Sequence, residues 1–276
     1  MELIVQQEKC IGCGACVRDC LRDLLYVEDG KARVKDGICI RCGHCVAVCP
    51  ADAVRLAGQP EEEILPYDPS SFDIPSAQLL NFMKFRRSIR QFKDKPVEQE
   101  KLDLLLEAAR YAPTGGNAQK TRYILLDESK DELTDLALKT LYDAAERMDS
   151  DPTLRGMERY RGKFSTMYPA WKERGKDDLF YNAPCVLMVV SRYPKAGTGR
   201  LDAGLASANA ELMAHALGLG VCYVGFFTVA AAMEPELYRR LGIRDGEKVV
   251  STLAIGYPNV KYCRTVNRKQ ADVTRL

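Results

Sequence analysis

The sequence has 276 residues, enough for one large domain or two smaller ones. Its 40 basic and 38 acidic residues leave a net charge of +2, so we expect no nucleic-acid-binding surface and no acidic tail. A hydrophobic content of 46% and a charged content of 28% exclude a disordered or fibrous protein. No run of about 18 apolar residues occurs, and the first residues do not resemble a signal peptide. We therefore expect no membrane span and a cytoplasmic location.

Three regions follow one another along the chain. Residues 1–57 contain eight of the 11 cysteines, and crowded cysteines without an export signal favour a metal site over disulfides. Residues 58–76 contain four prolines and five acidic residues but no basic ones, which predicts an extended, semi-rigid linker. Residues 77–276 carry 32 basic and 25 acidic residues, so this domain is mildly basic and suits an anionic ligand.

The third region alternates helical and strand patterns. Apolar residues at helical spacing predict a helix over 97–112. In chain order, we then expect a strand over 122–127, a helix over 131–148, an irregular polar and aromatic segment over 150–182, a strand over 185–193, a helix over 201–217, and strands over 221–227 and 249–257. The expected fold class is therefore α+β, with one sheet covered by helices.

Two cysteine runs with the same C-x2-C-x2-C-x3-C spacing dominate the first region. The first comprises Cys10, Cys13, Cys16 and Cys20, and the second comprises Cys39, Cys42, Cys45 and Cys49. Three thiolates at this spacing can wrap one [4Fe–4S] cubane, while the fourth cysteine of each run ligates the other cluster. We expect two clusters, one held by Cys10, Cys13, Cys16 and Cys49 and the other by Cys39, Cys42, Cys45 and Cys20. Structural zinc is the alternative, but zinc sites normally have a longer loop between two ligand pairs.

These runs resemble those of bacterial two-cluster ferredoxins. Pro50 follows the second run as in that family, whereas Leu21 stands where the family usually has a proline. His44 lies between two cysteines of the second run, and we expect it to face solvent because the cysteines already complete both ligand sets. The resemblance implies a ferredoxin-like domain over residues 1–57.

Segments of the third region resemble the FMN-dependent nitroreductase family in order and spacing. They are RRSIRQF (86–92), APTGGNAQ (112–119), GLGVCYVGFF (218–227), LAIGYP (253–258) and KYCRTVNRK (261–269). A ferredoxin–nitroreductase fusion is itself a known subtype of this family. The resemblance covers nearly all of residues 77–276 and implies an FMN-binding α+β domain that forms a homodimer with FMN in the subunit interface.

The RRSIR segment has the chemistry that an FMN phosphate needs, because arginine offers a planar fork of donors to phosphate oxygens. By resemblance, Arg86 and Ser88 hold the phosphate and the ribityl chain, and Arg87 matches a position that often touches FMN. Arg90 would reach the N1–O2 edge of the ring and stabilise its reduced, anionic form. For any one of these arginines, the alternative is a solvated surface charge.

The C-terminal segment resembles the part of the family that completes the phosphate site. Arg264 and Arg268 are the residues that match, and Lys261 competes with them for the role.

Two further segments resemble the walls of the flavin site. Pro113, Thr114, Gly115 and Asn117 match the loop that the partner subunit lays against the flavin, although the same glycines would also suit a plain helix C-cap. Lys120 follows Gln119 where the family usually has Pro-Trp, which affects the substrate side of the site. In the other segment, Gly225 matches the residue whose backbone N–H meets flavin N5, with Tyr223 and Val224 beside it.

The sequence therefore predicts an FMN-dependent oxidoreductase that reduces a small, electron-poor acceptor, such as a nitroaromatic or quinone-like compound. The clusters would relay electrons to or from FMN, and a ferredoxin and NAD(P)H are the candidate donors. Two alternatives remain open: an electron-transfer or redox-sensing protein that serves a partner protein, and a flavin reductase of the same fold with other chemistry, such as dehalogenation or enone reduction. Trp171, Tyr168 and Tyr160 either line a substrate entrance or pack in the core.

Overall fold

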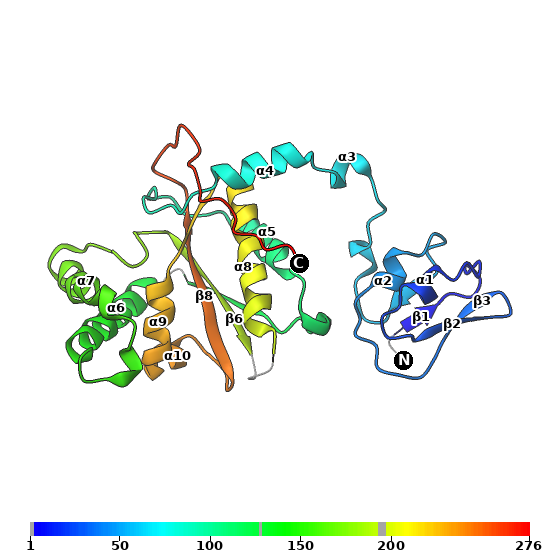
Figure 1. Ribbon diagram of the computed structural model, residues 1–276, viewed down its shortest axis with the longest axis horizontal. Coiled ribbons are helices and arrows are strands. Elements are labelled where there is room, and N and C mark those ends of the chain that lie inside the picture. Colours follow the sequence, from blue (N-terminus) through cyan, green and yellow to red (C-terminus); the bar gives the residue numbers. More distant parts are fainter. Residues whose placement is uncertain (1–2, 127–128, 193–196) are drawn as a thin grey trace. The chain divides into compact units, whose positions relative to one another are not determined.

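A computed structural model describes residues 3–126, 129–192 and 197–276. The chain divides into two compact units (Figure 1). The first comprises the residues up to Ile74 together with Gly116–Ala118, and the second comprises Pro75–Gly115 and Gln119–Leu276. The division after Ile74 lies inside the segment predicted as a linker. Among the described residues, no helix combines the length and apolar character needed to cross a membrane.

The first unit is built from two short antiparallel strand pairs and two single-turn helices. Strand β1 (Leu3–Val5) pairs with β4 (Val54–Leu56), and β2 (Leu25–Glu28) pairs with β3 (Lys31–Val34). Helices α1 (Ala15–Arg18) and α2 (His44–Ala47) each follow a left-handed glycine, with φ of 70° at Gly14 and 75° at Gly43. Glycine adopts this conformation without a Cβ penalty, so both cysteine runs can turn sharply at the same point.

The predicted linker is not simply extended. It contains the 3₁₀ turn η1 (Glu61–Glu63) and the short helix α3 (Pro69–Phe72). The Asp68 side chain accepts a hydrogen bond from the Ser70 backbone N–H, and Pro69 occupies the first helical position, so a local N-cap forms α3. No side chain of either element is buried, which agrees with the polar composition of this segment.

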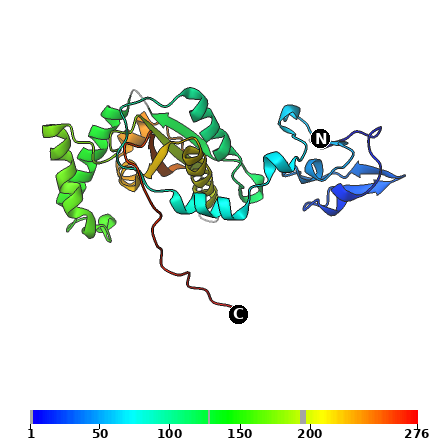
Figure 2. The same ribbon diagram turned by 90° about the horizontal axis from the view of Figure 1, so that it is seen from above.

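The second unit is a four-stranded antiparallel sheet with helices on both faces (Figures 1 and 2). The strand order is β5 (Arg122–Leu126), β6 (Cys185–Arg192), β8 (Glu247–Gly256) and β7 (Gly220–Tyr223). Side chains of β6 alternate between two hydrophobic clusters: Met188 belongs to one, while Leu187 and Val189 belong to the other. A strand buried on both faces reads as a continuous apolar run, which is what residues 185–190 are.

Each face of the sheet has its own set of helices. Helices α5 (Gln99–Arg110) and α8 (Gly199–Ala216) pack on one face. Helices α6 (Lys130–Arg147), α7 (Arg161–Arg174), α9 (Gly225–Met233) and α10 (Pro235–Arg240) pack on the other. The remaining elements are α4 (Ser76–Phe85) and the 3₁₀ turns η2 (Gly115–Asn117), η3 (Pro152–Leu154) and η4 (Glu158–Tyr160). The α+β prediction is confirmed.

Most predicted elements of the second unit form close to their expected bounds, and two predictions are wrong. The strand expected over 221–227 ends at Tyr223, and Gly225 begins α9. A short apolar run does not distinguish a strand from a buried helix, so the pattern could not find this boundary. The segment 150–182, expected to be irregular, contains α7, whose internal Pro169 disguises the helical pattern. The expected strand ends at 127 and 193 lie outside the described residues.

Candidate functional site

The eight cysteines of the first unit line two separate pockets. One pocket is lined by Cys10, Cys13, Cys16 and Cys49, and the other by Cys20, Cys39, Cys42 and Cys45. Each pocket combines three cysteines of one run with the fourth cysteine of the other run. This is the crossed grouping expected for two clusters, and apolar side chains such as Val54 and Leu56 complete the linings.

The electrostatics of the buried thiols reflect the same grouping. Burial raises the pKa of Cys16, and the negative charge of Cys49 raises it further. Burial also raises the pKa of Cys45 to about 11, with Cys42 and Cys20 adding to the effect. A cluster whose iron carries positive charge would remove this mutual repulsion of thiolates, so the cysteine set fits such a group.

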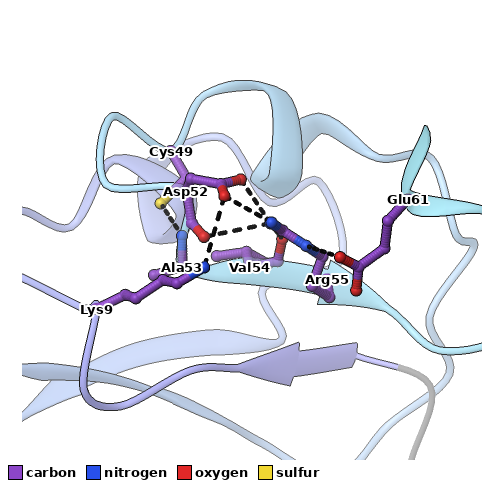
Figure 3. A network of polar contacts seen from close by, with 7 residues as sticks. All are labelled: Lys9, Cys49, Asp52, Ala53, Val54, Arg55 and Glu61. Atoms are coloured by element: carbon purple, nitrogen blue, oxygen red, sulfur yellow. Dashed lines mark hydrogen bonds and ion pairs between the residues drawn. The ribbon is translucent and has the colours of Figure 1, made fainter. Parts of the chain in front are cut away.

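Backbone N–H groups point at four of the sulfurs. The amides of Ala32, Leu24, Arg41 and Ala53 donate to the Sγ atoms of Cys10, Cys20, Cys39 and Cys49, at 3.3, 3.4, 3.3 and 3.3 Å respectively. The bond from Ala53 to Cys49 is drawn in Figure 3. Donors aimed at sulfur stabilise thiolates and tune the potential of any cluster they bind.

The arrangement does not fit a single metal ion. Within residues 3–126, 129–192 and 197–276, no three His, Cys, Asp or Glu side chains gather around one ion position. A zinc site needs such convergence, whereas the thiolates around a cubane each bind a different iron and stand farther apart. His44 lies at the start of α2 with 62% of its side chain exposed, and its Nδ1 is 3.8 Å from an Asp19 carboxylate oxygen.

In the second unit, the RRSIR segment lies along an edge of the sheet. It follows α4, and the Ile89 N–H donates to the Val221 carbonyl at 2.9 Å while Ser88 forms a bridge with Val221. Farther along, the Lys93 N–H donates to the Tyr257 carbonyl at 2.8 Å. These backbone bonds bring residues 88–93 together with Val221 and Tyr257, which lie far away in the sequence.

The three arginines of the segment have different surroundings. Arg86 forms a 2.7 Å ion pair with Glu211 of α8, and burial raises the pKa of Glu211 against the effect of that arginine. Arg87 donates to backbone carbonyls of its own turn, at Arg86 and Lys84. Arg90 lies beside the Cys222 thiol and 6.0 Å from the ring centroid of Tyr181. Arg86 and Arg90 therefore supply positive charge beside the end of β7.

An open helix N-terminus adjoins these arginines. Tyr223 ends β7, and the N–H of the buried Val224 donates to the Thr252 carbonyl at 2.8 Å. Gly225 is the first residue of α9, which has no side-chain cap. A Cβ added at Gly225 would meet no atom within 4 Å. Backbone N–H groups at a helix N-terminus favour electron-rich groups, so two arginines and this open position fit an anionic flavin.

The Pro113–Gly115 loop is anchored elsewhere on α8. The Gly115 N–H donates to Asp202 Oδ1 at 3.2 Å, and Thr114 Oγ1 accepts from the Gln119 N–H at 3.1 Å. Asp202 lies nine residues before Glu211, which corresponds to about 14 Å along the helix. Within one chain, the loop and Arg86 therefore contact different ends of α8. Asn117, with φ of 53°, belongs to the segment grouped with the first unit.

The C-terminal arginines lie in an irregular tail. Arg264 and Arg268 are exposed, and Figure 2 shows the end of the chain (red) leaving the sheet as an extended trace. No ion pair of either residue is found in the described part of the chain. Thr265 lines a groove with Phe82 and His215, which places this part of the tail beside the C-terminal half of α8.

Sequence reasoning missed Glu211 and did not resolve the aromatic residues. Glu211 lies among small and apolar residues in the predicted helix 201–217. Because a carboxylate is rarely buried without a partner, its position could have predicted a buried ion pair. Tyr160 packs against Phe164 and Phe226 with ring centroids 6.0 and 5.2 Å away, and Trp171 Nε1 donates to Asp135 at 3.1 Å. Both side chains have packing roles between α6, α7 and α9.

Comparisons with known proteins identify two domains in the chain. A model of the nitroreductase family matches residues 83–257, and a model of a 4Fe-4S dicluster domain matches residues 9–53. The nitrobenzene nitroreductase of Ectopseudomonas oleovorans is 24% identical over 196 residues, covering 64% of this chain and 85% of that protein. The FMN reductase [NAD(P)H] of Bacillus subtilis is 26% identical over 183 residues, covering 66% of each chain.

Solved structures show the same fold. A nitroreductase with bound FMN from Desulfitobacterium hafniense is 26% identical, covers 71% of this chain and 97% of its own, and has a TM-score of 0.53. A nitroreductase with bound FMN from Bacteroides fragilis is 22% identical, covers 72% and 99%, and also has a TM-score of 0.53. Because the nitroreductase model matches well over half of the chain, the protein belongs to the nitroreductase family of FMN-dependent oxidoreductases, with a 4Fe-4S domain in its N-terminal part.

Proposed function

We propose that the protein is an iron–sulfur flavoprotein that reduces a small, electron-poor acceptor, and that two [4Fe–4S] clusters relay electrons to its FMN. The observation that carries this proposal is the pair of cysteine pockets, each lined by three cysteines of one run and the fourth of the other. The presence of an electron-transfer domain and an FMN-dependent reductase domain on one chain favours electron transfer between the clusters and FMN.

The RRSIR segment would hold the flavin. Arg86 and Ser88 would take the phosphate and the ribityl chain, and Arg90 would face the N1–O2 edge of the ring. Glu211 fixes the Arg86 guanidinium from one side, which leaves its other donors for a phosphate. The local carbonyl bonds of Arg87 favour a role in shaping this turn. When bound, FMN supplies the ability to exchange either single electrons or a hydride with other molecules.

The end of β7 would support the reactive part of the ring. The Gly225 N–H would be directed at N5, with Tyr223 and Val224 beside it. The open surroundings of Gly225, where an added Cβ would meet no atom within 4 Å, support this approach. Arg264 and Arg268, with Lys261 as a competitor, would complete the phosphate site from the tail.

A second copy of the chain would complete the site. Pro113, Thr114, Gly115 and Asn117 would come from the partner subunit, which agrees with the separate anchoring of this loop on α8. Helix α4 has no buried residue although it contains Leu80 and Met83, which are 51% and 44% exposed. Apolar side chains left uncovered on a helix favour a homodimer interface.

The names of the relatives support the choice of acceptor and donor. One is a nitrobenzene nitroreductase and another an FMN reductase that uses NAD(P)H. We therefore propose a nitroaromatic or quinone-like acceptor, and a reduced ferredoxin or NAD(P)H as the donor. A second candidate, in which the protein passes electrons to a partner protein, is favoured by the N-terminal 4Fe-4S domain alone.

Anaerobic rapid mixing tests the relay. We compare FMN reduction by a low-potential one-electron donor in wild type and in a Cys13→Ser/Cys42→Ser variant. The variant should retain FMN and its reduction by NAD(P)H, but lose the fast phase with the one-electron donor. Cys263→Ser controls for the loss of a cysteine outside both pockets, and its FMN content is measured because Cys263 lies next to Arg264. Equal rates in wild type and variant would refute the relay.

The acceptor is tested separately with enzyme that has been reduced by dithionite under anaerobic conditions. Saturable turnover of a nitroaromatic or a quinone supports the reductase. Reoxidation by protein partners alone supports the electron carrier.

A further inference from the structure

The turn that follows Cys49 directs one backbone N–H at its sulfur. The Asp52 N–H donates to the Cys49 carbonyl at 3.3 Å, and Asp52 itself has φ of 50°, in the left-handed region. This conformation turns the next peptide back toward the start of the turn, so the Ala53 N–H reaches Cys49 Sγ at 3.3 Å. Residues other than glycine adopt positive φ at a cost, which the surroundings must offset.

Arg55 braces this turn with a dense set of contacts (Figure 3). Its two terminal nitrogens each lie 2.6 Å from a carboxylate oxygen of Asp52, and one of them also donates to the carbonyls of Asp52 and Val54, at 3.2 and 2.9 Å. Lys9 adds an ion pair to Asp52 at 3.7 Å, and Glu61 adds one to Arg55 at 3.5 Å. The Arg55 side chain is only 13% exposed, so this network holds the turn against β4.

The turn after Cys20 has the same backbone geometry but a weaker brace. Asp23 has φ of 52°, and the Leu24 N–H donates to Cys20 Sγ at 3.4 Å. The Asp23 carboxylate pairs with Lys35 at 3.3 Å, and this lysine side chain is 43% exposed, against 13% for Arg55; the two aspartates are both exposed, at 82% and 60%. Exposed lysine pairs contribute little, and lysine lacks the planar fork of arginine. The duplicated unit therefore contains one strongly braced turn and one weakly braced turn.

We propose that Asp52 and Arg55 are positioning residues that keep the Ala53 N–H on the Cys49 sulfur, and thereby raise the reduction potential of the cluster that Cys49 binds. The inference rests on the ligand sets proposed above. An N–H donor stabilises the extra negative charge that a cluster gains on reduction, and such outer contacts are known levers on cluster potential. The brace contacts the turn of one cluster only, so it contributes to a difference between the potentials of the two clusters.

A redox titration of the full-length, FMN-loaded protein, followed by EPR, tests this proposal. Arg55→Lys keeps the positive charge but removes the fork, and it should lower one of the two midpoint potentials while leaving the other unchanged. Asp23→Ala is the matched change in the other turn, and it should leave the potential that responds to Arg55→Lys unchanged.

A second pair of variants separates backbone geometry from charge. Asp52→Ala and Asp52→Gly remove the same carboxylate, but only glycine adopts positive φ freely. The potential of the affected cluster should therefore be lower in Asp52→Ala than in Asp52→Gly. This comparison still applies if Arg55→Lys loses iron.

Two results would overturn the inference: an Arg55→Lys protein with full iron content and both potentials unchanged, or equal potentials in the two Asp52 variants. A wild-type protein without two low-potential EPR signals would instead refute the two-cluster function on which the inference rests.

Discussion

Replacing Arg86 by methionine should leave the buried Glu211 carboxylate without its counter-ion. The two side chains meet at 2.7 Å and are 25% and 12% exposed. Breaking a fully buried pair costs about 3–5 kcal/mol, whereas an exposed pair contributes at most about 1 kcal/mol. The partial exposure of Arg86 places this pair between these limits, at a loss of about 2 kcal/mol. For a domain of this size, that loss lowers the melting temperature by about 4–8 °C.

The loss should depend on pH in a defined direction. Burial raises the pKa of Glu211 even with Arg86 present, and removing the arginine raises it further. A carboxyl whose pKa is higher in the folded than in the unfolded state destabilises the fold as it ionises. The destabilisation by Arg86→Met is therefore largest above this raised pKa. The destabilisation decreases as the pH falls toward about 4.3, which is the pKa of a glutamate in the unfolded chain.

Urea unfolding of the flavin-free protein, followed by tryptophan fluorescence, measures this effect. The chain has one tryptophan, Trp171, and it packs in the second unit. A double-mutant cycle with Glu211→Gln removes contributions from His215, whose pKa is lowered by burial and by Arg86. A coupling free energy below about 0.5 kcal/mol, or a loss that does not change with pH, would refute the reasoning.

Three further predictions concern composition, assembly and the flavin. The purified protein should contain about eight iron atoms, about eight sulfides and one FMN per chain, and tightly held zinc with little iron would contradict the two-cluster prediction. Cys49→Ser should disrupt the cluster that Cys10, Cys13 and Cys16 bind, although Cys49 belongs to the second cysteine run. Light scattering should show a dimer, and a monomer with full FMN occupancy would exclude the shared site. Gly225→Ala should weaken FMN binding but leave the unfolding free energy within about 1 kcal/mol of wild type, because the position is open and its φ is not positive. Gly162→Ala, at another open position, is the control, and equal FMN affinity in the two variants would exclude Gly225 from the FMN site.

The two cysteine runs predicted which side chains would come together. Spacing along a short, tightly turned chain brings the first three thiols of each run close, and the known pattern of paired runs places the fourth with the other run. The four cysteines expected for each cluster are the four that line each pocket, while their ligation of iron stays a prediction. The helices and strands of the second unit were also readable where an amphipathic or fully apolar run was long, as in α5 and β6.

The rest could not be read from the sequence, because it depends on tertiary contacts. Nothing local distinguishes the end of β7 from the start of α9, since the residues on both sides of Val224 are apolar or aromatic. The partner of Arg86 lies 125 residues away in Glu211, and no spacing rule connects them. Asp52 and Arg55 are close in sequence, but the sequence does not show that their contact holds the Ala53 N–H on the Cys49 sulfur.

The pairing of Ser88 and Ile89 with Val221 links FMN binding to protection against aggregation. Strand β7 lies at the edge of the sheet, where unpaired amides and carbonyls would offer a template to other chains. Residues 88 and 89 cover part of that edge, and they belong to the segment proposed to grip the flavin phosphate. If this segment detached from β7, the chain would lose FMN binding residues and at the same time expose the aggregation-prone edge of β7. Cofactor saturation would then protect the protein against aggregation, and flavin-starved cells would accumulate it in insoluble form.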